Sequence, residues 1–309
     1  MKVLTTLAER EYFLGLAALL NSLVEHGTHV DKVVVGYRGD LPDWLPPLRA
    51  SLHGQSFTLA GGLEVELIEL SGSLHMVHEK PKWFLHLTEV LEPEATEYFF
   101  FDSDIVINSR MSFYGNWVHQ GVALCGDVNF VFHRHHPIRR QWAKFARAAG
   151  REVVNELDDY YNSGFLGWTQ DTKQFIYDWN DAFAMLAPHS GDMHQFRVFD
   201  RTAVVLSTNQ DSLNLAAMIT EQPLSPIGPE AMGFIYGMRL MHHPIGAKPW
   251  NRKFFLEFWN GRPPREADLI FYQYVNGDQL RPLSEGRAKG MEALLKVLRF
   301  GGRFYRALT

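Results

Sequence analysis

The N-terminal part of the chain alternates between short apolar runs and one longer stretch with helical spacing. Residues 3–6 and 33–35 are short apolar or β-branched runs of the kind that form buried strands. Between them, from about residue 11 to residue 26, apolar residues recur every three or four positions, which predicts a helix. A strand, a helix and a strand in this order imply a right-handed crossover and a parallel sheet, whose ligand edge lies where the first strand ends.

The same two patterns continue to about residue 250. Further strands are expected at residues 65–70, 98–101, 105–108, 121–125 and 239–243, and helices at 82–91, 137–149, 171–186 and 210–219. Residues 160–168 are expected to enter one more strand through a polar turn that contains glycine. The chain is therefore predicted to be an α/β protein with an open, mostly parallel, Rossmann-like sheet flanked by helices. We expect one domain at residues 1–250 and a helical, basic C-terminal extension at residues 251–309.

The strand predicted at residues 98–101 is aromatic throughout and ends in two carboxylates. Four consecutive aromatic residues favour a strand that is buried on both faces. Asp102 and Asp104 follow directly, and in an extended backbone residues i and i+2 point to the same side, so the two carboxylates can converge on one small cation. Open α/β sheets bind ligands at this carboxyl edge. Taken alone, such a pair is more often part of a solvated turn.

Composition indicates an ordinary globular protein without disulfides. The only cysteine, Cys125, lies in an apolar run and is expected to be a small core residue. The sequence shows neither a signal-peptide pattern nor an apolar stretch of the roughly 18 residues that a bilayer requires, which predicts a cytoplasmic location. A net charge of -5 argues against general affinity for nucleic acid.

The charge is unevenly distributed along the chain. Residues 287–309 contain six basic side chains and one acidic side chain, a net charge of +5, so that the remaining residues carry -10. Within this segment Met291, Leu294, Leu295 and Leu298 form one apolar helical face, and aromatic residues alternate with Arg303 and Arg306 beyond it. Such a segment can rest on an anionic membrane, here the inner face of the cell membrane. The alternative is a terminal helix that packs on the domain.

Four motifs occur in an order that resembles glycosyltransferase family 8, the retaining GT-A enzymes that include glycogenin and the bacterial lipopolysaccharide galactosyltransferases. The resemblance spans about residues 3–250, and its opening is similar as well, with Thr5, Thr6 and Tyr12 after the first strand. The motifs are Asp102-Ser103-Asp104, Asn162-Ser163-Gly164, Asn209-Gln210-Asp211-Ser212-Leu213-Asn214 and the stretch from His242 to Trp250.

The resemblance implies a retaining hexosyltransferase that uses a UDP-sugar, depends on Mn²⁺ or Mg²⁺, and serves a glycan or lipid-linked acceptor. It implies that Asp102, Asp104 and a histidine hold the cation and that Lys248 meets the phosphates. Carboxylates and an imidazole suit Mn²⁺. Other residues are implied to surround the donor: Thr5, Thr6 and Tyr12 at the uridine, Lys82, Ser103 and Gly246 elsewhere on the nucleotide sugar, and Asn162, Ser163, Gly164, Gln210 and Asp211 around the sugar.

The sequence departs from the family pattern at three places. The family usually has glycine three residues and lysine six residues after the metal histidine, but Gly246 is three after His243 and Lys248 is six after His242. We favour His242, because the spacing to lysine then needs no gap, and His243 stays open. The family's Asp-Gln-Asp begins here with Asn209, which puts the choice of donor in doubt. Two extra residues precede Tyr12, which weakens the uridine assignment.

Each motif also has a purely structural interpretation. Gln210 and Asp211 can open and cap their helix, residues 162–164 can be a simple turn, and the segment from Lys248 to Trp250 can be a packing loop. His133, His135 and His136 are better explained by a solvated loop than by a metal site. Two further functions remain open: a nucleotidyltransferase, which would release pyrophosphate, and a nucleotide-sugar binding protein without turnover, which the change at Asn209 permits. For retention, Gln210 and Asp211 are the only candidate nucleophiles, and an amide is a poor one, which favours same-face attack assisted by the leaving phosphate.

Overall fold

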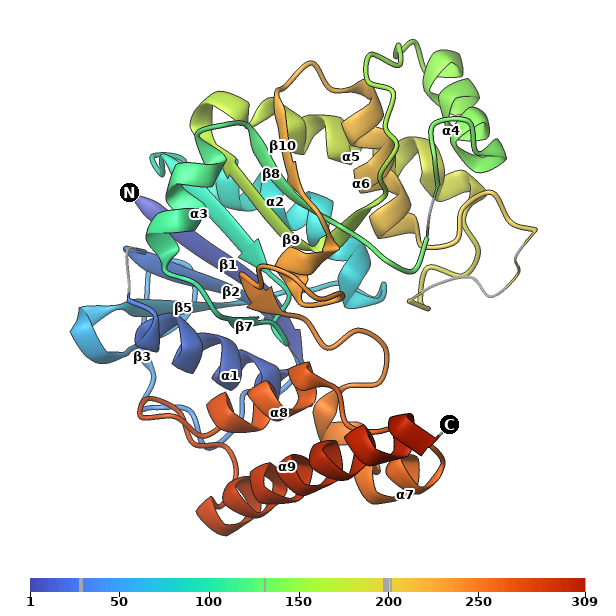
Figure 1. Ribbon diagram of the computed structural model, residues 1–309. Helices are drawn as coiled ribbons and strands as arrows, with labels where there is room; N and C mark the ends of the chain where they lie inside the picture. Colours follow the sequence, from blue (N-terminus) through green and yellow to red (C-terminus); the bar gives the residue numbers. More distant parts are fainter. Residues whose placement is uncertain (28–29, 131, 197–199, 201, 309) are drawn as a thin grey trace.

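The computed structural model describes residues 1–27, 30–130, 132–196, 200 and 202–308, with side chains described as far as Gly302. In this part of the chain a nine-stranded mixed sheet forms the centre of the molecule, in the order β10-β8-β9-β6-β1-β2-β5-β4-β3 (Figure 1). Its strands are β1 (Lys2–Glu9), β2 (Lys32–Arg38), β3 (Arg49–Ala50), β4 (Gln55–Thr58), β5 (Glu64–Glu69), β6 (Glu97–Phe101), β8 (Val122–Gly126), β9 (Tyr161–Thr169) and β10 (Leu224–Ile227).

The sheet combines parallel strands, as in a Rossmann-like fold, with one antiparallel strand near its middle. β6, β1, β2 and β5 are parallel neighbours, as the opening strand-helix-strand pattern predicts, and β8 is parallel to β10. β9 runs antiparallel to both β6 and β8. The beginning of β9 therefore lies at the same edge as the carboxyl ends of β6 and β8, so that residues from three neighbouring strands meet there.

Helices cover both faces of the sheet. One face packs against α2 (Lys80–His86), α4 (Pro137–Ala148), α5 (Gln174–Leu186) and α6 (Thr208–Ile219), and the other against α1 (Tyr12–Glu25) and α3 (Met111–Val118). The aromatic strand β6 contributes to both cores: Tyr98 and Phe100 belong to the first apolar cluster, and Phe99 and Phe101 to the second. The predicted burial of this strand on both faces is confirmed.

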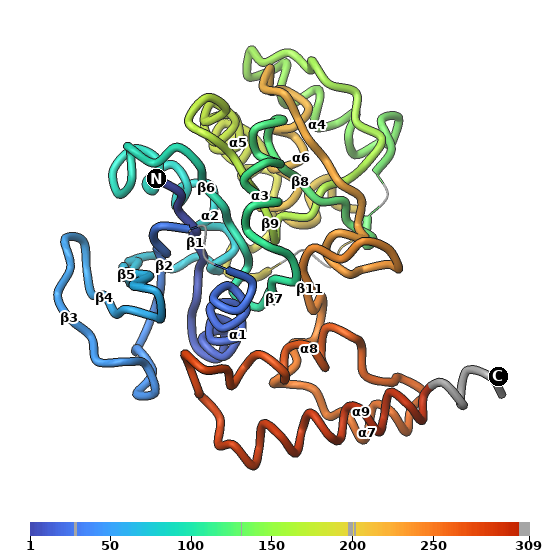
Figure 2. Tube along the Cα trace, turned by 60° about the vertical axis from the view of Figure 1, so that its left-hand side comes forward, coloured from blue at the N-terminus to red at the C-terminus, as the bar shows by residue number. Residues whose placement is uncertain are grey.

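The C-terminal extension packs on the domain through an apolar face. It consists of α7 (Phe254–Trp259), α8 (Glu266–Tyr274) and α9 (Glu285–Leu308), which gather beside α1 in both views (Figures 1 and 2). Leu295 and Leu298 of α9 are buried with Phe271 of α8 and with Ala18 of α1, and Met291 and Leu294 pack against the same cluster. The apolar face that could have met a membrane is thus occupied by protein. The side chains of Arg303 and Arg306 lie outside the described residues.

Several elements differ from the sequence prediction. Residues 162–164 are part of strand β9 and not a turn before it. The hairpin of β3 and β4, the helix α3 and the edge strand β10 were not predicted, because each is short or lacks a clear apolar period. A separate small pair of strands, β7 (Val106–Ile107) and β11 (Met241–His242), joins the segment after Asp104 to the segment before His243. Among the described helices, none is long and apolar enough to cross a membrane.

Candidate functional site

A cavity of about 740 Å³ opens at the carboxyl edge of the sheet. Its lining comes from the ends of β1, β6 and β8, from the start of β9, and from the loops before α6 and after β11. Such a volume lies in the range of small-molecule sites. Two groups of polar side chains form its walls. We call Lys80, Asp102, Asp104, His243 and Lys248 the charged wall, and Asp127, Asn162, Ser163 and Gln210 the amide wall.

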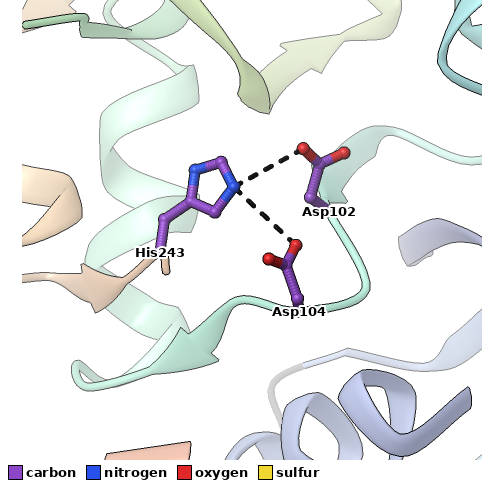
Figure 3. A group of neighbouring side chains, drawn as sticks. All are labelled: Asp102, Asp104 and His243. Carbon is purple, nitrogen blue, oxygen red and sulfur yellow. Dashed lines mark ion pairs between the residues drawn. The ribbon is translucent and has the colours of Figure 1, made fainter. Parts of the chain in front are cut away.

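In the charged wall each aspartate has one oxygen near a lysine and the other near the same imidazole. Lys80 Nζ lies 2.6 Å from Asp102 Oδ1, and Lys248 Nζ lies 2.6 Å from Asp104 Oδ2. The remaining oxygens, Asp102 Oδ2 and Asp104 Oδ1, lie 3.8 and 3.7 Å from His243 Nε2. Figure 3 shows the three side chains pointing toward one another. The gap between them is wider than a hydrogen bond and narrow enough for a bound ion.

The structure brings His243, and not His242, to the aspartates. The two residues are neighbours in an extended segment, so their side chains point to opposite sides. His242 faces the C-terminal extension: its charged neighbours are Glu266 and Arg299 of that extension and Arg239, and burial lowers its pKa to about 4. The preference for His242 rested on an unbroken spacing to Lys248. Gly246, three residues after His243, has a φ of +75° and lines the cavity, so the glycine spacing was the better guide.

The protonation states of the charged wall suit a cation. Burial lowers the pKa of His243 even though both aspartates oppose the shift, which keeps the imidazole neutral and its Nε2 available as a ligand. Burial alone would raise the pKa of Asp104, but Lys248, together with His243 and local hydrogen bonds, outweighs burial, lowers the pKa and keeps the carboxylate ionised. Asp102, Asp104 and His243 offer ligand atoms that all lie within 4.8 Å of one another. Two carboxylates and one imidazole fit Mn²⁺ well and Mg²⁺ less well.

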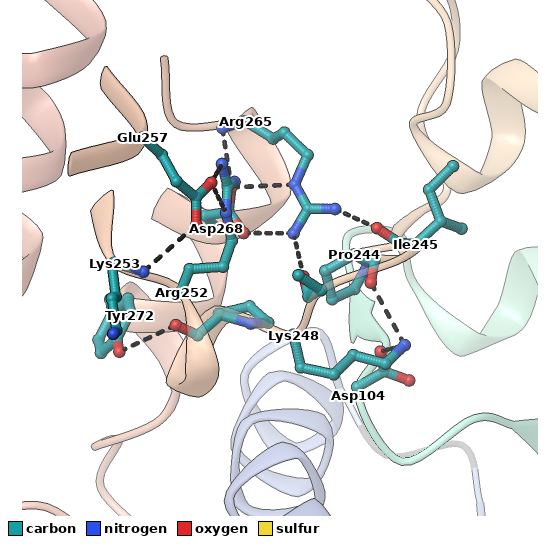
Figure 4. A network of polar contacts seen from close by, with 12 residues as sticks. Asp104, Pro244, Ile245, Lys248, Arg252, Lys253, Glu257, Arg265, Asp268 and Tyr272 are labelled. Carbon is teal, nitrogen blue, oxygen red and sulfur yellow. Dashed lines mark hydrogen bonds and ion pairs between the residues drawn. The ribbon is translucent and has the colours of Figure 1, made fainter. Parts of the chain in front are cut away.

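The loop that carries Lys248 is fixed by the C-terminal extension (Figure 4). Arg265 donates hydrogen bonds to the carbonyl oxygens of Ile245 and Ala247, the latter over 2.7 Å. Asp268, which is fully buried, accepts from both Arg265 and Arg252 and so holds the guanidinium groups in place. Residues after 250 therefore help to build the site, although the sequence suggested a separate appendage.

The amide wall is a chain of hydrogen bonds around Asp127. Its Oδ2 accepts from Asn162 Nδ2 over 2.5 Å and from Gln210 Nε2 over 3.1 Å. Gln210 Oε1 in turn accepts from the backbone N–H of Ser163 over 3.2 Å. Asn209 does not line the cavity: it donates to Ser163 Oγ over 2.8 Å from behind the wall. The wall thus offers a carboxylate and amide groups in fixed orientations, which suits a ligand rich in hydroxyl groups.

Asp211 lies outside the cavity, in contrast to its neighbour Gln210. Both of its oxygens are occupied, because Oδ1 accepts from Tyr160 Oη over 2.6 Å and Oδ2 accepts from the N–H groups of Leu206 and Ser207 over 2.7 and 2.9 Å. Burial raises its pKa to about 6. The side chain therefore fixes the entrance to α6, as the capping interpretation held, and the role implied for it beside the sugar does not fit this position.

The first strand extends further than the sequence pattern indicated, and this moves the predicted uridine residues. β1 continues to Glu9, so that Thr5 and Thr6 are buried within the strand, and Leu7 and Glu9 line the cavity. Thr5 Oγ1 donates a hydrogen bond to the carbonyl oxygen of Val34 and accepts one from Trp83 Nε1. Tyr12 does line the cavity, with its ring 5.4 Å from that of Trp250 in an edge-on arrangement. Only Tyr12 of the three is positioned to contact a ligand.

The cavity lysine of α2 is Lys80 and not Lys82. Lys80 is 2% exposed and also donates to the carbonyl oxygen of Ser163 over 2.8 Å, whereas Lys82 lies at the surface. Residues two apart on a helix point about 200° apart, so only one of the two can face the cavity.

Ser103 and Gly246 line the cavity, and Gly164 packs beneath the histidine. A Cβ at Gly164 would lie 2.7 Å from His243 Cε1, so any larger residue would displace the imidazole.

Lys80 and Asp127 were missed by the sequence analysis. Asp127 had the same signal as Asp102, because it follows a short buried strand directly. Lys80 had no signal beyond its place two residues before Lys82. His133, His135 and His136 do not line the cavity, and His136 instead caps α4 by accepting from the N–H of Ile138.

The fold and the site define an α/β protein with a Rossmann-like sheet and a candidate divalent-cation site at its carboxyl edge. No family model matches the chain, and no curated protein is similar to it.

Proposed function

We propose that this protein is a retaining glycosyltransferase of the GT-A type, similar to family 8, which transfers a hexose from a UDP-sugar and depends on Mn²⁺. One observation supports the proposal above all: Asp102, Asp104 and His243 converge at the carboxyl edge of the sheet, and Lys80 and Lys248 lie directly beside them. The family resemblance assigned a cation site to Asp102 and Asp104 together with a histidine.

The charges of the site favour a diphosphate. Two carboxylates and two lysines cancel, and His243 is neutral, so the charged wall has no net charge by itself. A divalent cation would add two positive charges at this wall and so attract a diphosphate there; the other two carboxylates that line the cavity, Glu9 and Asp127, lie outside the charged wall. The cation supplies charge neutralisation to the departing diphosphate when it is bound. Lys248 then offers the phosphates a second positive charge, because it is anchored within reach of the same edge.

The amide wall is a suitable surface for the hexose. Asp127 can accept hydrogen bonds from sugar hydroxyl groups, while Asn162 and Gln210 hold its carboxylate in one orientation. Tyr12 is the best-placed residue for the base, because it lines the cavity next to Lys248 and Trp250. The donor would then extend from Tyr12 past the charged wall to the amide wall.

Same-face attack is the better route to retention. Both oxygens of Asp211 are occupied away from the cavity, and Gln210 is an amide, so neither suits the role of nucleophile. Asp127 lines the cavity, but both of its oxygens accept hydrogen bonds, from the N–H of Asn129 and from the amides of Asn162 and Gln210, which lowers its nucleophilicity. In the same-face route the bond from the anomeric carbon to the phosphate oxygen breaks, the acceptor oxygen bonds to that carbon, and the acceptor proton passes to the departing phosphate. The acceptor is proposed to be a glycan or a lipid-linked sugar, reached from the cytoplasm.

A panel of nucleotide sugars incubated with Mn²⁺ tests the proposal. We expect release of UDP, which is lost in Asp104→Asn and kept in the control Asp171→Asn, an exposed aspartate on another element. The anomeric configuration of the product, read by proton NMR, tests retention. Release of pyrophosphate would instead indicate a nucleotidyltransferase. Tight metal-dependent UDP binding without any turnover would indicate a binding protein.

A further inference from the structure

The C-terminal extension exposes large apolar side chains on two helices. On α7, Phe255, Leu256 and Trp259 are 65%, 57% and 76% exposed, and on α9, Val297 and Phe300 are 68% and 60% exposed. We call these five residues the α7/α9 patch. They differ from the apolar face of α9 predicted from sequence, which is buried against α8.

The two helices of the patch lie side by side. A Cβ at Gly301 of α9 would lie 3.1 Å from the ring of Phe258 of α7, and a Cβ at Gly302 would lie 2.7 Å from Pro263. Figures 1 and 2 both show α7 against the C-terminal half of α9, at the edge of the molecule. Val297 and Phe300 immediately precede this contact. The exposed residues therefore belong to one region of the surface.

The charge of this region is opposite to that of the rest of the molecule. Residues 251–309 contain 11 basic and six acidic side chains, a net charge of +5, whereas residues 1–250 carry -10. Lys253 and Arg262 are exposed just before and just after α7, whereas Lys296 of α9 is exposed but forms an ion pair with Glu292. Glu257, the acidic residue of α7, is paired with Arg252. Positive charge at both ends of α7 thus flanks the exposed aromatic and aliphatic side chains of this helix.

We propose that the α7/α9 patch docks onto an anionic lipid surface. Tryptophan and phenylalanine favour the boundary between head groups and acyl chains, and flanking cations bind anionic head groups. A nucleic acid would use the cations but leave Leu256 and Val297 in water. The docking is peripheral, since the buried face of α9 stays on the domain. It does not depend on the proposed transfer reaction, although it would bring that reaction to lipid-linked acceptors.

Vesicle sedimentation of the full chain tests the docking without nucleotide or metal. We expect the protein to sediment with vesicles of phosphatidylcholine and phosphatidylglycerol and much less with phosphatidylcholine alone. The double variant Leu256→Ala/Trp259→Ala should reduce binding at least tenfold. The control variant Leu52→Ala/Val154→Ala removes exposed apolar side chains outside the C-terminal extension and should leave vesicle binding unchanged.

The exposed basic side chains beside the patch allow a second test, in which the loss of vesicle binding is measured for each charge removed. Lys253→Gln and Arg262→Gln should each weaken binding to the anionic vesicles by about fivefold, the equivalent of about 1 kcal/mol per cation. Unchanged melting temperatures would exclude unfolding as the cause. No binding by the wild-type chain, or equal losses in patch and control variants, would overturn the proposal. So would a dimer in sedimentation velocity that only the patch variants dissociate, because the occupant would then be a second copy of the chain.

Discussion

The two walls of the cavity are built on different principles. The charged wall pairs each carboxylate with a lysine and takes its side chains from segments far apart in sequence, between Lys80 and Lys248. The amide wall contains one carboxylate, and its members are joined by direct hydrogen bonds from Asp127 through Gln210 to Ser163. The charged wall suits a cation and phosphates, and the amide wall suits neutral hydroxyl groups. Mutations in the charged wall should therefore impair binding of the cation and UDP, whereas mutations in the amide wall should impair turnover.

The largest difference in UDP affinity is expected between variants at Asp104 and variants at Asp127. Asp104→Ala removes a cation ligand and leaves Lys248 without its partner, so Mn²⁺-dependent UDP binding should fall by at least ~100-fold. Asp127→Asn should leave UDP binding nearly unchanged and lower turnover. Titration calorimetry with UDP and Mn²⁺ measures both. Equal losses of UDP affinity in the two variants would contradict the division into two walls.

Within the charged wall, Lys248→Ala should lower turnover much more than it lowers the affinity for the cation. Its charge is needed most as negative charge develops on the departing phosphate, so we expect turnover at saturating donor to fall by ~100- to 1000-fold. Mn²⁺ affinity should change much less. Lys144→Ala, which removes an exposed lysine of α4 outside the cavity and the α7/α9 patch, serves as the control. Wild-type turnover in Lys248→Ala would remove this residue from the mechanism.

The adjacent histidines test the position of the cation directly. His243→Ala should weaken Mn²⁺ by roughly 10- to 100-fold, because Nε2 lies between both aspartates. His242→Ala should have a smaller effect on Mn²⁺, since its side chain faces the C-terminal extension. Electron paramagnetic resonance of bound Mn²⁺ reads both variants. The reverse ranking would mean that the cation lies on the other side of this segment.

The smallest effect is expected at Asp211, behind the amide wall. Its pKa is raised from 3.8 to about 6 by burial, so the folded protein holds the proton more tightly than the unfolded chain. Stability from this group is therefore greatest below pH 4 and falls as the pH rises to about 6, by at most ~3 kcal/mol. The Asp211→Asn variant should lack this pH-dependent part of the stability and keep its activity. Denaturant unfolding of both proteins between pH 4 and pH 7 measures it, and parallel curves would contradict it.

The sequence predicted what depends on local periodicity. The aromatic run and the alternation of i and i+2 placed Asp102 and Asp104 together at a strand end, and the structure has them there. The choice between His242 and His243 depends on which face of a short strand meets the cavity, and Lys80 and Lys82 differ only by a rotation about α2. The apolar face of α9 was visible in the sequence, but not whether protein or lipid covers it. These questions are decided by tertiary packing.

The position of β9 has a consequence for the order of folding. β8 and β10 join the sheet only through β9, which lies between β8 and β6. The parallel strands β1, β2, β5 and β6 are complete by residue 101, but β8 must wait for residues 161–169 before it can pair. We therefore expect the amide wall to belong to a later and less protected cooperative unit than the strand that carries Asp102. Native-state hydrogen exchange should show β8 and β10 opening together while β1 and β2 remain closed.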